Sequence, residues 1–177
     1  MGRLDRFHEA QADPHAGFAA ALREIEAGQK RSHWIWYVFP QLAGLGAYST
    51  AVHYALADEA EATDYLRDPV LGDRLVQAAA AARRHLTGPG AVSVVLLMGS
   101  AIDALKLVSS MTLFGHVAER LRATSPEPRF AVMAEHARAI LAAAARAGYD
   151  RCAFTAARLG RSAPDRPAPG RPGPGTR

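Results

Sequence analysis

Only one stretch of this chain has the composition of a β-strand. Segment 92–98, VSVVLLM, is rich in β-branched and large apolar residues, which favour strands. A strand needs a neighbouring strand to pair its backbone hydrogen bonds, and no other segment of the sequence has this pattern. We therefore expect segment 92–98 to form a short buried helix and the fold to be all-α.

Apolar side chains recur at helical spacing along most of the remaining chain. Phe18, Ala21, Leu22 and Ile25, for example, share one helical face, and Gly28 follows them as a typical C-cap. Further helices are expected over about residues 4–13, 58–66, 69–86, 100–108, 109–123, 128–147 and 150–159.

Capping residues predict where these helices begin. Asp58 and Glu61 have the spacing of a capping box, and Pro69 suits the first turn of a helix. The remaining expected N-caps are Ser100, then Ser109 or Ser110, and finally Asp150. The second of these caps would divide the segment after Ser100 into two short helices.

Length and composition predict one folded domain with a tail. A chain of 177 residues with 49% hydrophobic and 21% charged residues suits a single globular domain. We expect residues 1–160 to form a compact domain of short helices. Residues 161–177, RSAPDRPAPGRPGPGTR, are dominated by Pro, Gly and Arg and are expected to be a disordered tail.

The charge distribution argues against a nucleic-acid partner. The formal net charge is +4, but segment 161–177 carries four arginines and one aspartate, so the expected folded part is almost neutral. The longest apolar run, AVSVVLLMG, is too short to span a bilayer, and we expect no membrane partner. A lone cysteine, Cys152, and a polar N-terminus favour a cytoplasmic location. The sequence leaves the oligomeric state open.

Two lysines stand against nineteen arginines, and both lie in dense groups of unusual residues. Lys30 opens residues 30–46, KRSHWIWYVFPQLAGLG, which we call the aromatic segment. Lys106 lies in residues 99–115, GSAIDALKLVSSMTLFG, which we call the DxxK segment. An ammonium group is a compact point charge with a tunable pKa, and a guanidinium imitates neither property. Both segments mix polar with large apolar residues, so we expect them to meet and line one pocket.

The aromatic segment offers a stacking surface for a ring compound. Trp34 and Trp36 can stack on a base or sugar, and positive charge beside the rings suits a phosphorylated ligand. The candidate ligand-binding residues are Lys30, Arg31, Trp34, Trp36 and Gln41, with His33 as a candidate catalytic residue. The alternative is a packed aromatic core in which the indole N–H groups are hydrogen-bonded.

The DxxK segment places a carboxylate, an ammonium and hydroxyls close together on a helix. Asp103 and Lys106 are three residues apart, and Ser109 and Ser110 follow one turn later. Asp103 is a candidate general base, and Lys106, Ser109 and Ser110 are candidate ligand-binding residues. The alternative is an exposed ion pair worth about 0.3 kcal/mol, followed by a serine N-cap.

The sequence contains no recognised metal or cofactor motif. None of the seven histidines has another histidine four residues away, and only one cysteine could join them, so we expect no metal site. Walker loops and the patterns GxGxxG and GxSxG do not occur, so we expect no cofactor.

Four motifs in this order resemble those of the DUF1810 family of bacterial and fungal proteins. They are RFxxAQ from residue 6, KRSHWxWxxFPQxxGLG from residue 30, DPVLGxRL from residue 68 and DxxKLxSSxTLF from residue 103. The resemblance extends from about residue 4 to residue 114 and implies an all-α fold. Family members are sometimes labelled calpastatin, but that inhibitor is a disordered repeat protein, whereas this sequence predicts a folded core. A looser similarity in general character to the NADAR proteins implies an ADP-ribose-type ligand.

Two hypotheses about function follow. The first is a pocket for an anionic, nucleotide-like small molecule, with Asp103 and His33 as acid–base groups if the protein hydrolyses an N-glycosidic or phosphate ester bond. The second is a non-catalytic interaction or regulatory module in which the aromatic segment is core. Convergence of Lys30, His33, Asp103 and Lys106 on one concave surface would favour the first hypothesis.

Overall fold

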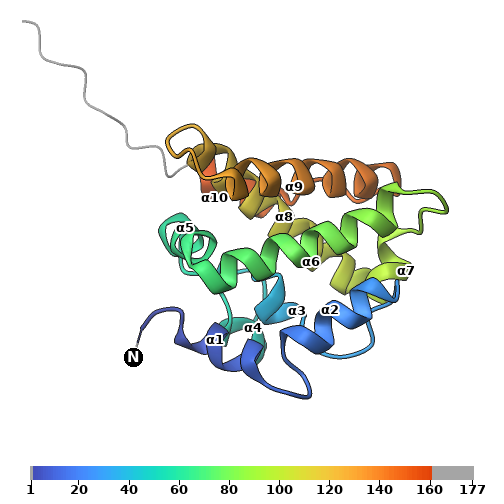
Figure 1. Cartoon of the computed structure of the whole chain (residues 1–177), viewed down its shortest axis with the longest axis horizontal. Helices are drawn as coiled ribbons and strands as arrows, with labels where there is room; N and C mark the ends of the chain where they lie inside the picture. The colour runs from blue at the N-terminus through green and yellow to red at the C-terminus, as the bar shows by residue number, and fades with distance from the viewer. Residues whose placement is uncertain (1, 161–177) are drawn as a thin grey trace, which may run out of the picture.

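The computed structural model describes residues 2–160, and within that range the chain forms ten α-helices and no strand beyond an isolated bridge between Leu42 and Leu56 (Figure 1). The expected all-α fold is confirmed, and the expected tail lies outside the described residues. The helices are α1 (Asp5–Ala12), α2 (Phe18–Glu26), α3 (Ile35–Val38), α4 (Ser49–His53), α5 (Glu59–Arg67), α6 (Pro69–Thr87), α7 (Val94–Met98), α8 (Ala101–Arg122), α9 (Pro128–Arg146) and α10 (Ala153–Gly160).

Helix α8 is the central element of the fold. Eight consecutive residues, 107–114, are buried, so this helix is covered on all sides through its middle turns. It packs against α9, and α9 packs in turn against α6, which makes a layer of long helices (Figure 1). Helices α3, α5, α7 and α10 cover the other faces of α8.

The predicted break within α8 is wrong. The helix runs without interruption from Ala101 to Arg122, and neither Ser109 nor Ser110 caps a helix. Both serines are buried, so packing by the surrounding helices decides their conformation. The predicted cap at Ser100 is confirmed, because its Oγ accepts a hydrogen bond of 3.1 Å from the backbone N–H of Asp103.

Three of the other local predictions are confirmed and one is wrong. Asp58 accepts a hydrogen bond from the N–H of Glu61, and Pro69 opens α6, as the sequence predicts. Segment 92–98 contains α7, so its interpretation as a helix is confirmed. The predicted cap at Asp150 is wrong, because α10 begins at Ala153 and the carbonyl of Cys152 accepts its first helical hydrogen bond.

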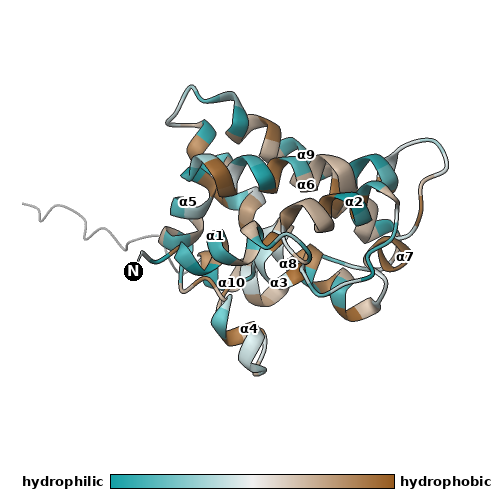
Figure 2. Ribbon diagram, turned by 60° about the horizontal axis from the view of Figure 1, so that its bottom comes forward, coloured by the Kyte–Doolittle hydropathy of each residue, from teal (hydrophilic) through white to brown (hydrophobic). Residues whose placement is uncertain are grey.

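A loop projects from the helical body between α3 and α5. We call residues 43–55 the projecting loop; it contains α4, none of whose residues is buried (Figure 2). Two backbone hydrogen bonds close its base, from Ala43 N to Leu56 O at 2.8 Å and from Leu56 N to Gln41 O at 2.9 Å. These bonds fix where the loop leaves and rejoins the body.

Helix α1 also anchors the projecting loop. Arg6 donates from Nη2 to the carbonyl of Ala55 and to Oε1 of Glu61, both at 2.9 Å. Gln11 donates from Nε2 to the carbonyl of Tyr37 at 2.7 Å. The half-buried Arg6 and the buried Gln11 of the RFxxAQ motif therefore hold together the chain on both sides of the loop.

Ser110 within α8 and Ser100, which caps this helix, should respond differently to substitution by alanine. Ser110 is buried and its hydroxyl has no hydrogen-bond partner within residues 2–160, so Ser110→Ala should leave the free energy of unfolding unchanged or raise it by about 0.5 kcal/mol. Ser100→Ala removes an N-cap and should lower it by about 1 kcal/mol. Urea unfolding measures both values, and a loss of about 1 kcal/mol at Ser110 would show that its hydroxyl does have a partner.

Candidate functional site

Asp103 joins the aromatic segment to the DxxK segment. Its Oδ2 lies 2.7 Å from Lys30 Nζ, and its Oδ1 lies 2.9 Å from Lys106 Nζ. The Lys30 side chain is only 7% exposed and that of Asp103 only 15%, so this is a largely buried cluster of three charges. The expectation that the two segments meet is confirmed, with Asp103 as the point of contact.

The backbones of the two segments also meet at Gly99. This glycine follows α7 with φ +77, a conformation that side chains disfavour. A Cβ there would lie 2.8 Å from the carbonyl oxygen of Lys30, while the Lys30 N–H donates to Leu97 O at 2.8 Å. Glycine therefore permits the close approach that brings Lys30 to Asp103.

The lysine cluster carries a net positive charge. Burial opposes ionisation of Asp103, but the hydrogen bonds from Lys30 and Lys106 outweigh it and lower the pKa of the carboxyl group. One ionised carboxylate between two ammonium groups leaves one positive charge in excess. Both oxygens of Asp103 contact a lysine. The role of Asp103 as a general base stays a prediction.

A carboxylate that the sequence did not suggest organises the start of the aromatic segment. Glu24 of α2 accepts from the backbone N–H groups of Arg31 at 2.7 Å and Ser32 at 3.0 Å. It also accepts from the Ser32 hydroxyl and from the indole Nε1 of Trp34, each at 2.7 Å. Burial opposes the charge, but these donors outweigh it and lower the pKa of Glu24 from 4.5 to about 2.

The two tryptophans of the aromatic segment occupy different environments. Trp34 is fully buried and its indole N–H is paired with Glu24, as in the alternative of a packed aromatic core. Trp36 is only partly buried, and Lys106 Nζ lies 3.5 Å from the centroid of its ring. Lys106 is therefore held both by the face of an aromatic ring and by Asp103.

A cavity of about 710 Å³ opens beside Trp36 and Lys106. Four parts of the chain meet around it: α3, the projecting loop with the residues before it, the first half of α8, and the residues that precede α10. Its lining residues are Trp36, Gln41, Leu45, Gly46, Ala47, Tyr48, Ile102, Leu105, Lys106, Val108, Ser109, Asp150 and Cys152.

Polar contacts continue along one wall of this cavity. The buried Ser109 hydroxyl lies 3.1 Å from Thr155 Oγ1, which donates to Cys152 Sγ at 3.3 Å. Burial opposes ionisation of the thiol, but the hydrogen bonds from Thr155, Ser109 and the backbone of Phe154 outweigh it and lower the pKa of Cys152. The wall of the cavity thus includes the chain's single thiol and the buried Ser109 hydroxyl, which Thr155 connects.

The cavity gathers four of the ten predicted site residues: Trp36, Gln41, Lys106 and Ser109. Lys30 and Asp103 form the charge cluster that contacts Lys106 but do not line the cavity. The four others lie elsewhere: Trp34 and Ser110 are buried, and Arg31 and His33 are exposed. The sequence did not suggest Tyr48, Ile102, Leu105, Asp150 or Cys152 as parts of a site.

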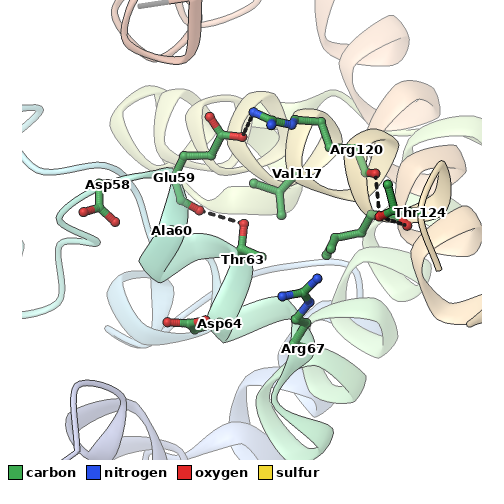
Figure 3. A pocket seen from close by; sticks show the side chains of 10 residues that line it. Asp58, Glu59, Ala60, Thr63, Asp64, Arg67, Val117, Arg120 and Thr124 are labelled. Atoms are coloured by element: carbon green, nitrogen blue, oxygen red, sulfur yellow. Dashed lines mark hydrogen bonds and ion pairs between the residues drawn. The ribbon is translucent and has the colours of Figure 1, made fainter. Parts of the chain in front are cut away.

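A second cavity, of about 610 Å³, lies between α5 and α8 (Figure 3). An ion pair of 2.6 Å joins Glu59 to Arg120 at its edge, and Arg67 points into the space. None of the predicted site residues lines it, and its walls carry charges of both signs. We therefore take the cavity beside Trp36 as the candidate site.

Among the residues that the structure describes, no group of three or more His, Cys, Asp or Glu side chains could hold a metal ion. Within the same part of the chain, no helix combines the length and apolar character needed to cross a membrane.

Comparisons with known proteins give one family and one solved structure. The family described as "Protein of unknown function (DUF1810)" matches residues 2–130. The crystal structure of the conserved hypothetical protein Rv1873 from Mycobacterium tuberculosis is similar to this chain, with 34% sequence identity and a TM-score of 0.64. The similarity covers 87% of this chain and 94% of that one. No curated protein matches the chain.

Glu24→Gln should destabilise the protein in a pH-dependent way. The substitution keeps the shape of the side chain but removes the charge that four donors stabilise, so the free energy of unfolding should fall by about 2 kcal/mol at about pH 7. Because folding lowers the pKa of Glu24, its contribution is complete above the unfolded pKa and is lost as the pH falls from 4.5 towards 2.

Urea unfolding at about pH 7 and about pH 3 measures this dependence. The difference between the wild type and Glu24→Gln should be smaller at the lower pH. An equal difference at both values would show that the charge of Glu24 does not stabilise the fold.

Proposed function

Since the chain belongs to the DUF1810 family, whose function is unknown, we propose from its geometry that the cavity beside Trp36 binds a small molecule that carries an anionic group and a flat ring. One observation carries the proposal: the ammonium of Lys106 lies 3.5 Å from the Trp36 ring centroid at the wall of a cavity of about 710 Å³. Such a site offers a positive charge and an aromatic surface to the same ligand.

The hydrogen-bonding capacity of Lys106 supports this proposal. An ammonium has three N–H donors, and Asp103 accepts from one of them. The Trp36 ring faces the ammonium at 3.5 Å, which leaves at least one N–H for a phosphate, sulfate or carboxylate oxygen. Because Lys30 shares Asp103, the carboxylate does not cancel the positive charge of the cluster.

The proposal concerns recognition, and it includes the nucleotide-like and ADP-ribose-type ligands expected from the sequence. Hydrolysis has less support in the geometry. Asp103 is engaged by two lysines, and His33 is exposed and does not line the cavity. A carboxylate and an imidazole that act together on a bond must both reach the ligand.

Lys106→Met should weaken the binding of ring-bearing phosphate monoesters such as phenyl phosphate and AMP. The variant keeps an apolar stem over Trp36 but removes the charge, so affinity should fall about tenfold or more, or roughly 1.4 kcal/mol. Arg31→Met is the matched control, because it removes one positive charge from an exposed residue of the aromatic segment that does not line the cavity. Isothermal titration calorimetry measures all three proteins.

The single cysteine can show where the compound binds. Cys152 lines the cavity, so a saturating ligand should slow alkylation of the thiol by iodoacetamide.

Two results would contradict the proposal. An equal loss of affinity in Lys106→Met and Arg31→Met would show that Lys106 acts only through the net charge of the protein. Failure of every phosphate monoester to bind at millimolar concentration would refute the proposed function.

A further inference from the structure

Large apolar side chains remain exposed where the candidate cavity meets solvent. Tyr48 of the projecting loop is 81% exposed, and Ile102 and Leu105 of α8 are 68% and 55% exposed. All three line the same cavity, although they come from two different elements. Single exposed apolar residues are ordinary, but a group of them around a cavity is typical of a binding site.

The two exposed apolar residues of α8, Ile102 and Leu105, lie on the same face of the helix as Lys106. Leu105 and Lys106 lie three and four residues after Ile102, and Ser109 lies one turn beyond them, which places these residues along one side of the helix. A ligand whose anionic group contacts Lys106 can therefore place its remaining part along Leu105 and Ile102. That part is recognised by apolar contact.

The acidic groups around the cavity limit the charge of the ligand. Asp150 lines the cavity and is exposed, so it repels additional anionic groups. Asp103, which could otherwise accept hydrogen bonds from sugar hydroxyls, already uses both oxygens on Lys30 and Lys106. The site thus favours one anionic group, and the exposed side chains of Ile102 and Leu105 offer no hydrogen bond to a sugar.

The projecting loop has little packing of its own near Tyr48. Gly44, with φ +103, approaches Phe154 of α10 so closely that a Cβ would lie 2.8 Å from its ring. This contact attaches the base of the loop, but α4 buries none of its residues. An apolar ligand body would supply the missing contacts of Tyr48.

Resting on the proposed function, we propose that the cavity selects amphipathic compounds: a single anionic group joined to an apolar, preferably aromatic, body. Tyr48, Ile102 and Leu105 determine this specificity by covering the apolar body, while Lys106 binds the anionic group. Compounds in which a sugar follows the phosphate bind less tightly, because the apolar side chains do not compensate the loss of water from its hydroxyls.

A series of ligands with the same head group tests this specificity. Inorganic phosphate, phenyl phosphate, 1-naphthyl phosphate and AMP are titrated into the full-length chain by calorimetry. Each ring that is buried against the apolar residues should improve affinity, and 1-naphthyl phosphate should bind about tenfold more tightly than phenyl phosphate. AMP should bind less tightly than 1-naphthyl phosphate.

Two leucines provide a matched comparison. Leu105 and Leu96 are 55% and 52% exposed, but only Leu105 lines the cavity. Leu105→Ala should reduce the preference for naphthyl over phenyl phosphate to about threefold or less, whereas Leu96→Ala should leave it unchanged. Tyr48→Ala, at another exposed position, should act like Leu105→Ala and provides the same test if that variant folds poorly.

The possible outcomes separate the two proposals. If AMP binds at least as tightly as 1-naphthyl phosphate, with Lys106 still required, the apolar specificity is wrong and the proposed function stands. An equal effect of Leu105→Ala and Leu96→Ala also overturns the specificity. If no compound in the series binds, both proposals fail.

Discussion

A single carboxylate, that of Asp103, connects the two parts of the chain that build the candidate site. Its ion pair with Lys30 holds the aromatic segment beside the first turns of α8, where Lys106, the second partner of Asp103, lies over Trp36. The cavity lies next to that junction. Removing one partner of a buried ion pair typically costs about 3–5 kcal/mol, because the other charge is left without compensation. The geometry also explains why lysine occurs at both positions: two compact ammonium groups fit on one carboxylate, and one of them also lies against Trp36.

Local signals in the sequence predicted most of the fold. Asp58, Pro69 and Ser100 act within a few residues of their own positions, so their sequence context was sufficient to place the starts of three helices. The predicted break at Ser109 or Ser110 was wrong for the opposite reason. Helix α8 is surrounded by other helices, and this packing outweighs the tendency of serine to begin a helix.

The candidate site was only partly predictable. Trp36 and Lys106 could be identified from composition and spacing, and they line the cavity. Trp34, a residue of the same type two positions away, is buried instead, because Glu24 of a different helix accepts its indole N–H. The need of a buried indole for an acceptor was visible in the sequence, but the identity of that acceptor was not. The exposure of Tyr48 likewise depends on how the projecting loop leaves the body.

The free energy of coupling between Lys30 and Asp103 tests most directly whether their ion pair holds the candidate site together. A double-mutant cycle with Lys30→Met, Asp103→Asn and the combined variant, measured by urea unfolding, isolates the energy of this pair. The low exposure of both side chains and their separation of 2.7 Å predict a coupling free energy of about 2 kcal/mol or more. A coupling below about 0.5 kcal/mol, as for an exposed ion pair, would contradict the view that this contact holds the site together.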